Sequence, residues 1–73
     1  MAKLHIRNHV RRLREERGIT QSDLARTSAC TRQTIIMLEQ ERYVPSLSLA
    51  FAVTRSLGAS LEEVFEPEEK SEN

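Results

Sequence analysis

Residues 20–39 read TQSDLARTSACTRQTIIMLE, and this stretch decides the fold of the 73-residue chain. Thr20 and Thr31 are suited to cap helix N-termini, because a hydroxyl oxygen can accept a backbone N–H from the first helical turn. Each is followed by residues that repeat apolar side chains at helical spacing. The segment therefore predicts two short helices joined by a tight turn at Ala29 and Cys30.

The second of these helices, expected over residues 31–39, has two different faces. Ile35 and Leu38 recur at helical spacing and are expected to point into a core. The opposite face presents Arg32, Gln33, Ile36 and Met37. A helix can enter the DNA major groove when a core holds one face and the free face carries side chains that match base edges. Arginine suits guanine and glutamine suits adenine, so Arg32 and Gln33 are candidate base contacts.

Helix signals continue on both sides of this unit. A first helix is expected from residue 7 or 8 to residue 17, with Gly18 as its C-terminal stop. A fourth helix is expected between the cap Ser46 and Gly58, and residues 60–63 spell a full capping box, Ser-Leu-Glu-Glu, that begins a fifth helix ending at residue 64 or 65. The expected buried side of the fourth helix comprises Leu47, Ala50, Phe51, Val53, Thr54 and Leu57.

The two ends of the chain carry weaker signals. Residues 3–6 alternate polar and apolar side chains, which leaves open a short strand that pairs with residues 64–66 of the same chain or of a symmetry mate. Pro67 is expected to stop any continuation of the fifth helix. We therefore place one domain over residues 7–66 and expect residues 67–73 to form an acidic, disordered tail.

Charge is distributed unevenly along the chain. There are 11 basic and 11 acidic residues, so the formal net charge is zero. Residues 1–32 contain eight basic and three acidic side chains, whereas residues 33–73 contain three basic and eight acidic ones. A binding surface responds to the local potential rather than to the sum. The basic half is therefore compatible with nucleic acid, and the acidic end is expected to point away from it.

Several function classes lack their sequence signals. The chain has one cysteine, Cys30, and two histidines, His5 and His9, so neither a disulfide nor a metal site is expected. Cys30 is interpreted as a core thiol. No Gly-x-Ser-x-Gly elbow and no phosphate loop occurs, so we expect neither an enzyme nor a cofactor. Without a long apolar run or a signal-peptide pattern, a cytoplasmic, nucleoid-associated protein with no membrane contact is expected.

Several motifs together resemble the Cro and phage-repressor family of helix-turn-helix regulators. These motifs are residues 18–25, 31–35, 38–39, 43–47 and 57–65. They agree with the family in order and spacing over nearly the whole chain, most closely with very short regulators that are little more than a DNA-binding domain. The resemblance implies an all-α, five-helix, lambda-repressor-like DNA-binding domain with its helix-turn-helix motif over about residues 21–40. A short pairing of terminal β-strands stays open.

The resemblance also implies roles for individual residues at double-stranded DNA. The implied DNA contacts are Gln21, Thr31, Arg32, Gln33, Thr34, Ile36, Met37, Arg42 and Ser46. Arg32 and Gln33 would read bases in the major groove, while Gln21 would touch a phosphate and brace the recognition helix. The resemblance further implies that Arg14 pairs with Glu39 and so ties the first helix to the third.

Four positions depart from the usual pattern of that family. Ala29 stands where the family usually has glycine in a left-handed turn, and a side chain there costs on the order of 1 kcal/mol. Glu41 also stands where glycine is common, so we expect the following loop to differ. Ile36 and Met37 are apolar where polar residues are commoner. We favour contacts with thymine methyl groups for them over a protein-contact surface.

The function that best fits these observations is a sequence-specific transcriptional repressor that binds a palindromic operator as a homodimer. Two alternatives also bind DNA: an antitoxin that binds a toxin protein and regulates its own gene, and a restriction-modification controller. A chain of this size has little core, so a dimer is the expected source of added stability. We expect the interface at Leu57, Leu61, Val64 and Phe65, because a short terminal helix has little core of its own to cover them. A strand from residues 3–6, pairing next to residues 64–66, is left open as a second part of this interface.

Overall fold

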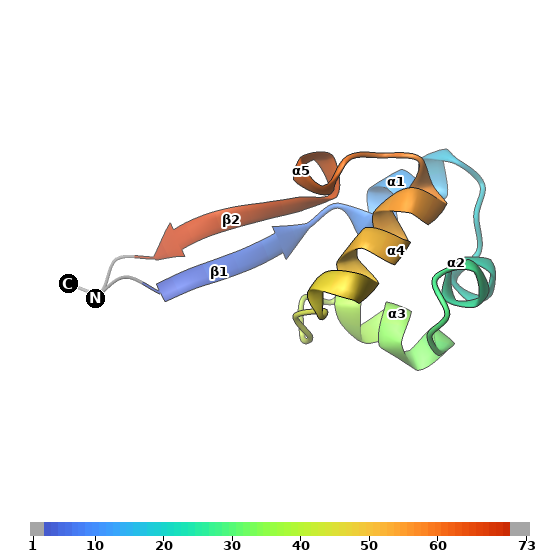
Figure 1. The fold of residues 1–73 in the computed structure, drawn as a ribbon, viewed down its shortest axis with the longest axis horizontal. Coiled ribbons are helices and arrows are strands. Elements are labelled where there is room, and N and C mark those ends of the chain that lie inside the picture. Colours follow the sequence, from blue (N-terminus) through green and yellow to red (C-terminus); the bar gives the residue numbers. More distant parts are fainter. Residues whose placement is uncertain (1–2, 71–73) are drawn as a thin grey trace.

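The computed structural model describes residues 3–70, in which five helices lie between two strands (Figure 1). The elements are β1 (Lys3–Asn8), α1 (Val10–Glu16), α2 (Gln21–Thr27), α3 (Arg32–Glu39), α4 (Leu47–Leu57), α5 (Leu61–Val64) and β2 (Phe65–Lys70). The helices form one body, from which the two strands project as a ribbon, so the molecule measures 41 × 20 × 19 Å. The five expected helices are present, and the terminal strand pairing that the sequence left open is formed within the chain.

Four helices begin at the hydroxyl caps expected from the sequence. The side-chain oxygens of Thr20, Thr31 and Ser46 accept the backbone N–H groups of Asp23, Thr34 and Leu49 at the starts of α2, α3 and α4. At α5, Ser60 and Glu63 form the full capping box, with reciprocal bonds of 3.1 and 2.9 Å. These bonds satisfy N–H groups that have no partner inside the helix, so the caps place the helix starts.

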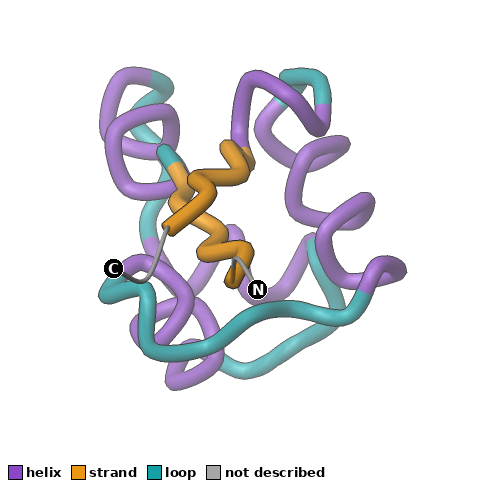
Figure 2. The backbone as a smooth tube through the Cα atoms, turned by 90° about the vertical axis from the view of Figure 1, so that its left-hand side faces the viewer, coloured by secondary structure: helices purple, strands orange, loops and turns teal. Residues whose placement is uncertain are grey.

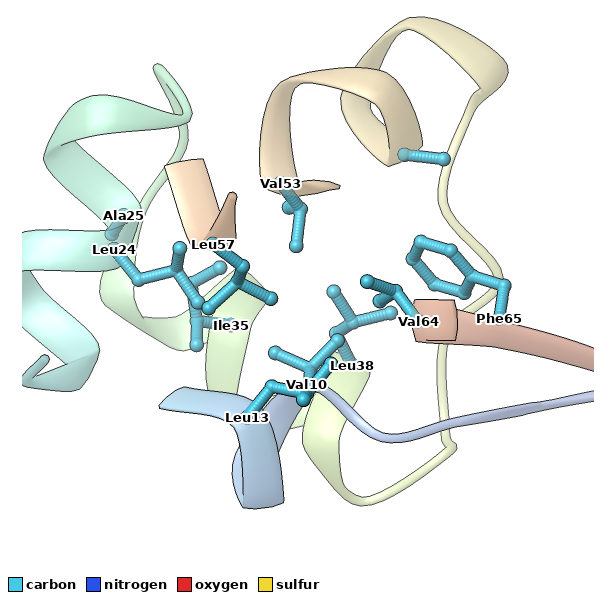
Figure 3. Close-up of a cluster of buried hydrophobic side chains, with 11 residues drawn as sticks. Val10, Leu13, Leu24, Ala25, Ile35, Leu38, Val53, Leu57, Val64 and Phe65 are labelled. Atoms are coloured by element: carbon cyan, nitrogen blue, oxygen red, sulfur yellow. The ribbon is translucent and has the colours of Figure 1, made fainter. Parts of the chain in front are cut away.

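The core lies where the helices meet the base of the ribbon (Figure 3). It is formed by Val10, Leu13, Leu24, Ala25, Ile35, Leu38, Ala50, Val53, Leu57, Val64 and Phe65. The buried stripe of α4 is narrower than expected from the sequence, because Leu47 and Phe51 are 67% and 46% exposed. Both lie to one side of the stripe that runs through Ala50, Val53 and Leu57, so their assignment to the buried side is wrong.

The two chain ends pair with each other in an antiparallel ribbon. The register runs from Lys3 opposite Lys70 to Asn8 opposite Phe65. The backbone N–H of His9 continues the pairing by donating to the Val64 carbonyl at 2.8 Å. Figure 2 looks along this ribbon, which stands in front of the helical body. Of the pairings left open by the sequence, the one within a single chain is therefore present.

The ribbon changes two boundaries expected from the sequence. The first helix begins at Val10 rather than at residue 7 or 8, because the preceding residues belong to β1 and pair with residues more than 50 positions away. The tail expected to be disordered from residue 67 instead continues β2 as far as Lys70. Residues 71–73 of that expected tail lie outside the described part of the chain.

Pro67 fits into β2 because of where the hydrogen bonds fall. The backbone N–H of Asn8 points away from β2, since it donates to the carboxylate of Glu41 at 3.0 Å. Hydrogen-bonded and non-hydrogen-bonded pairs alternate along an antiparallel ladder, so Ile6 opposite Pro67 also occupies a non-hydrogen-bonded position. A proline, which has no N–H, is tolerated there.

Candidate nucleic-acid interface

The outward face of α3 is the candidate surface for base contacts. Arg32 and Gln33 are exposed in its first turn, while Ile36 and Met37 on the same face are half-buried. On the opposite face, Ile35 and Leu38 are fully buried. The helix therefore has the two faces expected from the sequence: one fixed in the core, and one that presents polar side chains at its N-terminal end.

A nearly buried ion pair fixes α3 to the two helices beside it. Arg14 of α1 donates from Nε and Nη2 to the Glu39 carboxylate at 2.6 and 3.3 Å, and the two side chains are 12% and 5% exposed. Gln21 of α2 donates to the same carboxylate at 3.0 Å. A third bond runs from Arg14 Nη1 to the Ile19 carbonyl at 2.9 Å. The expected Arg14–Glu39 pair is thus confirmed, as is the bracing of α3 by Gln21.

The same contacts keep the arginine charged. Hydrogen bonding to Glu39 raises the pKa of Arg14 above its ordinary value, against the opposing effect of burial. A guanidinium in a two-bond fork with a carboxylate also has a fixed orientation. The pair therefore places a permanent cation and its partner at the joint between α1 and α3.

A polar hollow of about 460 Å³ lies beside this joint. Its lining residues are Arg11, Arg14, Thr20, Gln21, Ser22 and Arg32. Two of these three arginines are in ion pairs, Arg14 with the nearly buried Glu39 and Arg11 with the exposed Glu15. The polar lining, with Arg11 and Arg32 at the exposed surface, suits an oxygen-rich anion such as a DNA phosphate.

The C-terminal end of α3 is held by residues from the ribbon and from the following loop. The Asn8 side-chain amide donates to the Leu38 carbonyl at 2.8 Å, while the Asn8 backbone N–H binds Glu41. The hydrogen bond from that N–H lowers the pKa of Glu41, and a contact with His5 at 3.6 Å acts in the same direction. Asn8 and Glu41 thus couple the position of α3 to that of β1.

Both unusual turn positions adopt the left-handed conformation. The φ angles of Ala29 and Glu41 are +57° and +60°. Ala29 therefore carries the strain expected from its place in the family pattern. The loop at Glu41 keeps the glycine-like conformation, so the expectation that it would differ because glycine is absent is wrong.

The remaining expected DNA contacts lie at the two ends of α3. At its start, the Thr31 and Thr34 hydroxyls are 2.9 Å apart, and at its other end Arg42 is exposed in the loop before α4. The Ser46 hydroxyl is engaged in capping α4 and lies 3.2 Å from the Ser48 hydroxyl. These residues flank the outward face of α3, with Gln21 at the side of the polar hollow.

Cys30 packs against the core at the turn between α2 and α3. Burial raises the pKa of its thiol, which keeps the thiol protonated. The two histidines contact carboxylates, with His9 lying 3.1 Å from Glu66. Within residues 3–70, no group of three potential ligand side chains is placed to hold a metal ion, and no helix is long and apolar enough to cross a membrane.

Three of the four residues expected at a dimer interface are core residues of their own chain. Leu57, Val64 and Phe65 are 2%, 0% and 9% exposed, and Leu61 is partly buried against the same cluster. The premise that a short terminal helix leaves them uncovered is wrong, because they pack in one cluster with buried side chains of the other helices. These side chains are therefore not available as the main contact surface of a dimer.

Four further residues belong to the site but were not predicted from the sequence to have a role there. Arg11 and Ser22 line the polar hollow, and Asn8 and Glu41 hold the end of α3. Arg11 lies one helical turn before Arg14, so helical spacing could have placed it at the hollow. Nothing in the local sequence indicates the Asn8–Glu41 contact, because it depends on the ribbon.

Comparisons with known proteins give consistent matches. A helix-turn-helix family model matches residues 10–64. An uncharacterized HTH-type transcriptional regulator of Methanothermobacter thermautotrophicus is 48% identical over 61 residues, which cover 82% of this chain and 88% of the relative. The uncharacterized HTH-type transcriptional regulator YgzD of Bacillus subtilis is 38% identical over 66 residues, which cover 90% of this chain and the whole relative.

A solved structure is similar as well. The clp gene regulator ClgR from Corynebacterium glutamicum superposes with a TM-score of 0.71 at 31% sequence identity. The similarity covers 74% of the present chain and 57% of the ClgR chain. The fold is therefore shared, while a large part of ClgR has no counterpart in this comparison.

Proposed function

The chain belongs to the helix-turn-helix family and is a transcriptional regulator with a DNA-binding domain, and from this premise we propose that it recognises a palindromic operator as a homodimer and represses transcription there. The main support for the proposal is the way in which the fold holds α3. Its polar N-terminal face is free, while the Arg14–Glu39 pair and Gln21 hold its other end to α1 and α2.

In this proposal α3 lies in the major groove and reads base edges with its first turn. Arg32 donates to a guanine, and Gln33 pairs with an adenine. Ile36 and Met37, one turn further along, contact apolar base groups such as thymine methyls. The half-burial of these two side chains supports this role, because it limits their freedom before DNA binds.

The residues around α3 bind the phosphate backbone. One phosphate occupies the polar hollow, where Gln21 and Ser22 supply neutral donors and Arg11 supplies charge. Thr31, Thr34, Arg42 and Ser46 flank the groove on both sides. Phosphate contacts fix the register of the protein on the duplex and add affinity that falls with salt, whereas base contacts provide the specificity.

A homodimer is proposed because a single helix reads few base pairs. Two copies on a palindrome place their recognition helices about 34 Å apart, one helical turn of DNA. Occupation of such a site by a dimer excludes polymerase and so represses transcription.

The test is selection of bound duplexes from random DNA with the full 73-residue chain. We expect an inverted repeat whose half-sites are centred about 10 base pairs apart or a multiple of that spacing. The double variant Arg32→Ala, Gln33→Ala is the matched control and should enrich no common sequence. If the unmodified chain also enriches none, sequence-specific binding is wrong. An enriched single half-site without symmetry would instead remove the palindrome and the homodimer from the proposal.

A further inference from the structure

An apolar hollow of about 260 Å³ lies where the ribbon meets the start of α4. Its lining includes Ile6, Val44, Pro45, Leu47, Leu61 and Phe65. Val44 and Leu47 are each 67% exposed, and contiguous exposed apolar groups mark contact surfaces in folded proteins. None of the lining residues is among the proposed DNA contacts, although Pro45 and Leu47 flank Ser46 in the chain.

The ribbon extends this surface away from the helical body. Cross-strand partners lie on the same face of a ribbon, and successive side chains along each strand point to opposite faces. The register therefore places Leu4, Ile6, Pro67 and Phe65 together, with Glu69 at the tip opposite Leu4. Leu4 is 64% exposed. The other face carries polar groups, including the Arg7–Glu68 ion pair at 3.4 Å.

We propose that a second copy of this chain covers this continuous apolar surface across a twofold axis. The projecting ribbon of each copy, with Leu4 near its tip, packs against the hollow beside Leu47 of the other. This inference rests on the homodimer of the proposed function and specifies which surface forms it. It retains Leu61 and Phe65 of the interface expected from the sequence, which line the hollow, and adds Leu4 and Leu47 in place of the core residues Leu57 and Val64.

Charge favours a second copy as the occupant. Side chains near a twofold axis meet their own counterparts, so an ionised group there would face a like charge. The hollow has no ionisable side chain in its lining. On the ribbon face Leu4, Ile6 and Pro67 are uncharged, and Glu69 near the tip is the ionisable side chain that the register adds. By contrast, the hollow beside α2 has Arg11, Arg14 and Arg32 in its lining, of which Arg11 and Arg14 pair with Glu15 and Glu39.

The ribbon itself is a second reason. An isolated two-stranded ribbon is marginally stable in water, and further strands or a packed face are needed to stabilise it. Here the packing within one chain reaches Phe65 and Ile6 at the base, while Leu4 further out is left exposed. A partner ribbon crossing this face would cover the outer half of the ribbon and the hollow together.

The experiment compares two glutamate substitutions on one helix by sedimentation equilibrium. Leu47→Glu places a charge in the proposed interface, at the first position of α4, where a carboxylate is compatible with the helix. The matched control is Phe51→Glu, which also replaces an exposed apolar residue of α4 but lies outside the hollow. Protein concentrations of about 1 to 100 µM span the range from tight to weak dimers.

We expect the unmodified chain and Phe51→Glu to be dimers, and Leu47→Glu to have a dimer Kd at least about tenfold higher with unchanged helical circular dichroism. Leu4→Ser should weaken the dimer too, which tests the ribbon separately from the hollow. The surface is wrong if Leu47→Glu dimerises like the unmodified chain, or if Phe51→Glu weakens the dimer equally.

Binding to a single half-site separates the failure of this surface from the failure of the proposed function. Leu4→Ser, which lies in the ribbon, should bind a half-site duplex as well as the unmodified chain does and lose only part of the gain seen on the full palindrome. A dimer unaffected by Leu47→Glu overturns the surface alone. An unmodified chain that stays monomeric, and binds the palindrome no more tightly than a half-site, overturns the homodimer as well.

Discussion

The recognition unit, formed by α2 and α3, and the β1–β2 ribbon use ion pairs in different ways. In the first, Glu39 of α3 pairs with Arg14 of the neighbouring α1. The two side chains are 5% and 12% exposed, and several hydrogen bonds connect α3 to α1 through them. In the ribbon, the Arg7–Glu68 pair is 53% and 43% exposed and lies on one face, while the other face leaves apolar groups uncovered. The first region is complete within one chain, and the second has a surface that suits a partner.

This difference teaches that the two regions meet different requirements. A recognition helix must hold its orientation before DNA arrives, so its supports are buried and hydrogen-bonded within the chain. An interface between copies must remain accessible in the single chain, so its apolar groups stay exposed until a partner covers them. Asn8 joins the two regions, because it belongs to β1 and binds the end of α3.

The largest expected effect is on the buried pair. Glu39→Ala removes the acceptor of Arg14 and Gln21 and leaves a guanidinium with little access to water. Breaking a buried ion pair from one side costs about 3–5 kcal/mol, so we expect the free energy of unfolding to fall by about 3 kcal/mol. Urea unfolding followed by circular dichroism, at one fixed protein concentration, measures the change.

The control for Glu39→Ala is Glu16→Ala, which removes a surface pair on the same body. Arg12 and Glu16 lie 3.3 Å apart, with 59% and 54% of their side chains exposed. Such a pair contributes about 0–1 kcal/mol. If both variants lost the same unfolding free energy, the buried Arg14–Glu39 pair would contribute no more to stability than the exposed Arg12–Glu16 pair, which would contradict this account.

A smaller effect is expected at the joint between the two regions, and it depends on pH. The Asn8 N–H lowers the pKa of Glu41 in the folded state. The carboxylate therefore stabilises the fold above its unfolded pKa of about 4.3, and this contribution is lost as the pH falls through the lower folded value. Glu41→Gln should thus be less stable than the unmodified chain at neutral pH.

At about pH 3 the difference in unfolding free energy between Glu41→Gln and the unmodified chain should shrink, because the pH has then fallen below the unfolded pKa of about 4.3 toward the lower folded value. Glu16→Gln, whose carboxylate contacts exposed arginines, serves as the charge-matched comparison. Thermal unfolding at both pH values gives the result. A stability difference that stays constant with pH would mean that the charge of Glu41 does not stabilise the contact between β1 and the end of α3.

The smallest expected effect concerns strain within the recognition unit. Ala29 has a φ of +57°, a conformation that glycine adopts without cost. Ala29→Gly should therefore raise the free energy of unfolding by about 0.5–1 kcal/mol. Glycine removes the left-handed strain, but part of that gain is offset because glycine also increases the entropy of the unfolded chain. The midpoint of urea unfolding reports the gain.

Gly58→Ala is the control that makes the reverse substitution, since Gly58 has a φ of +67° and no atom lies within 4 Å of an added Cβ. It should lose about 1 kcal/mol through backbone strain alone. A loss of stability in Ala29→Gly would indicate that the alanine methyl group makes a packing contribution larger than the strain it causes.

The recognition unit could largely be predicted from the sequence. Caps such as Thr20 and Thr31 act within three residues, and the inward positions Ile35 and Leu38 follow from helical spacing, so local patterns contain this information. The resemblance to the Cro and phage-repressor family is confirmed by the family match, and the Arg14–Glu39 pair that it implied is present. The roles of Arg32 and Gln33 at DNA stay predictions.

The ribbon could be predicted only in part. Alternation over residues 3–6 indicated a strand, but its length depends on pairing with residues near the other end of the chain. The same long-range packing buries Val64 and Phe65, which local sequence gave no reason to separate from exposed residues such as Leu47. Periodicity shows which side of a helix is apolar, and only the fold shows how much of that side is covered.

The most direct test of the account is the affinity of Arg32→Ala for its selected operator compared with its affinity for random duplex DNA. The matched control is Arg12→Ala, which removes the same charge from the exposed surface of α1. The account predicts that Arg32→Ala loses about 1–3 kcal/mol of binding free energy on the operator and much less on random DNA, while Arg12→Ala loses similar small amounts on both. Equal losses on the two DNAs for Arg32→Ala would make this residue a phosphate contact and contradict base reading by α3.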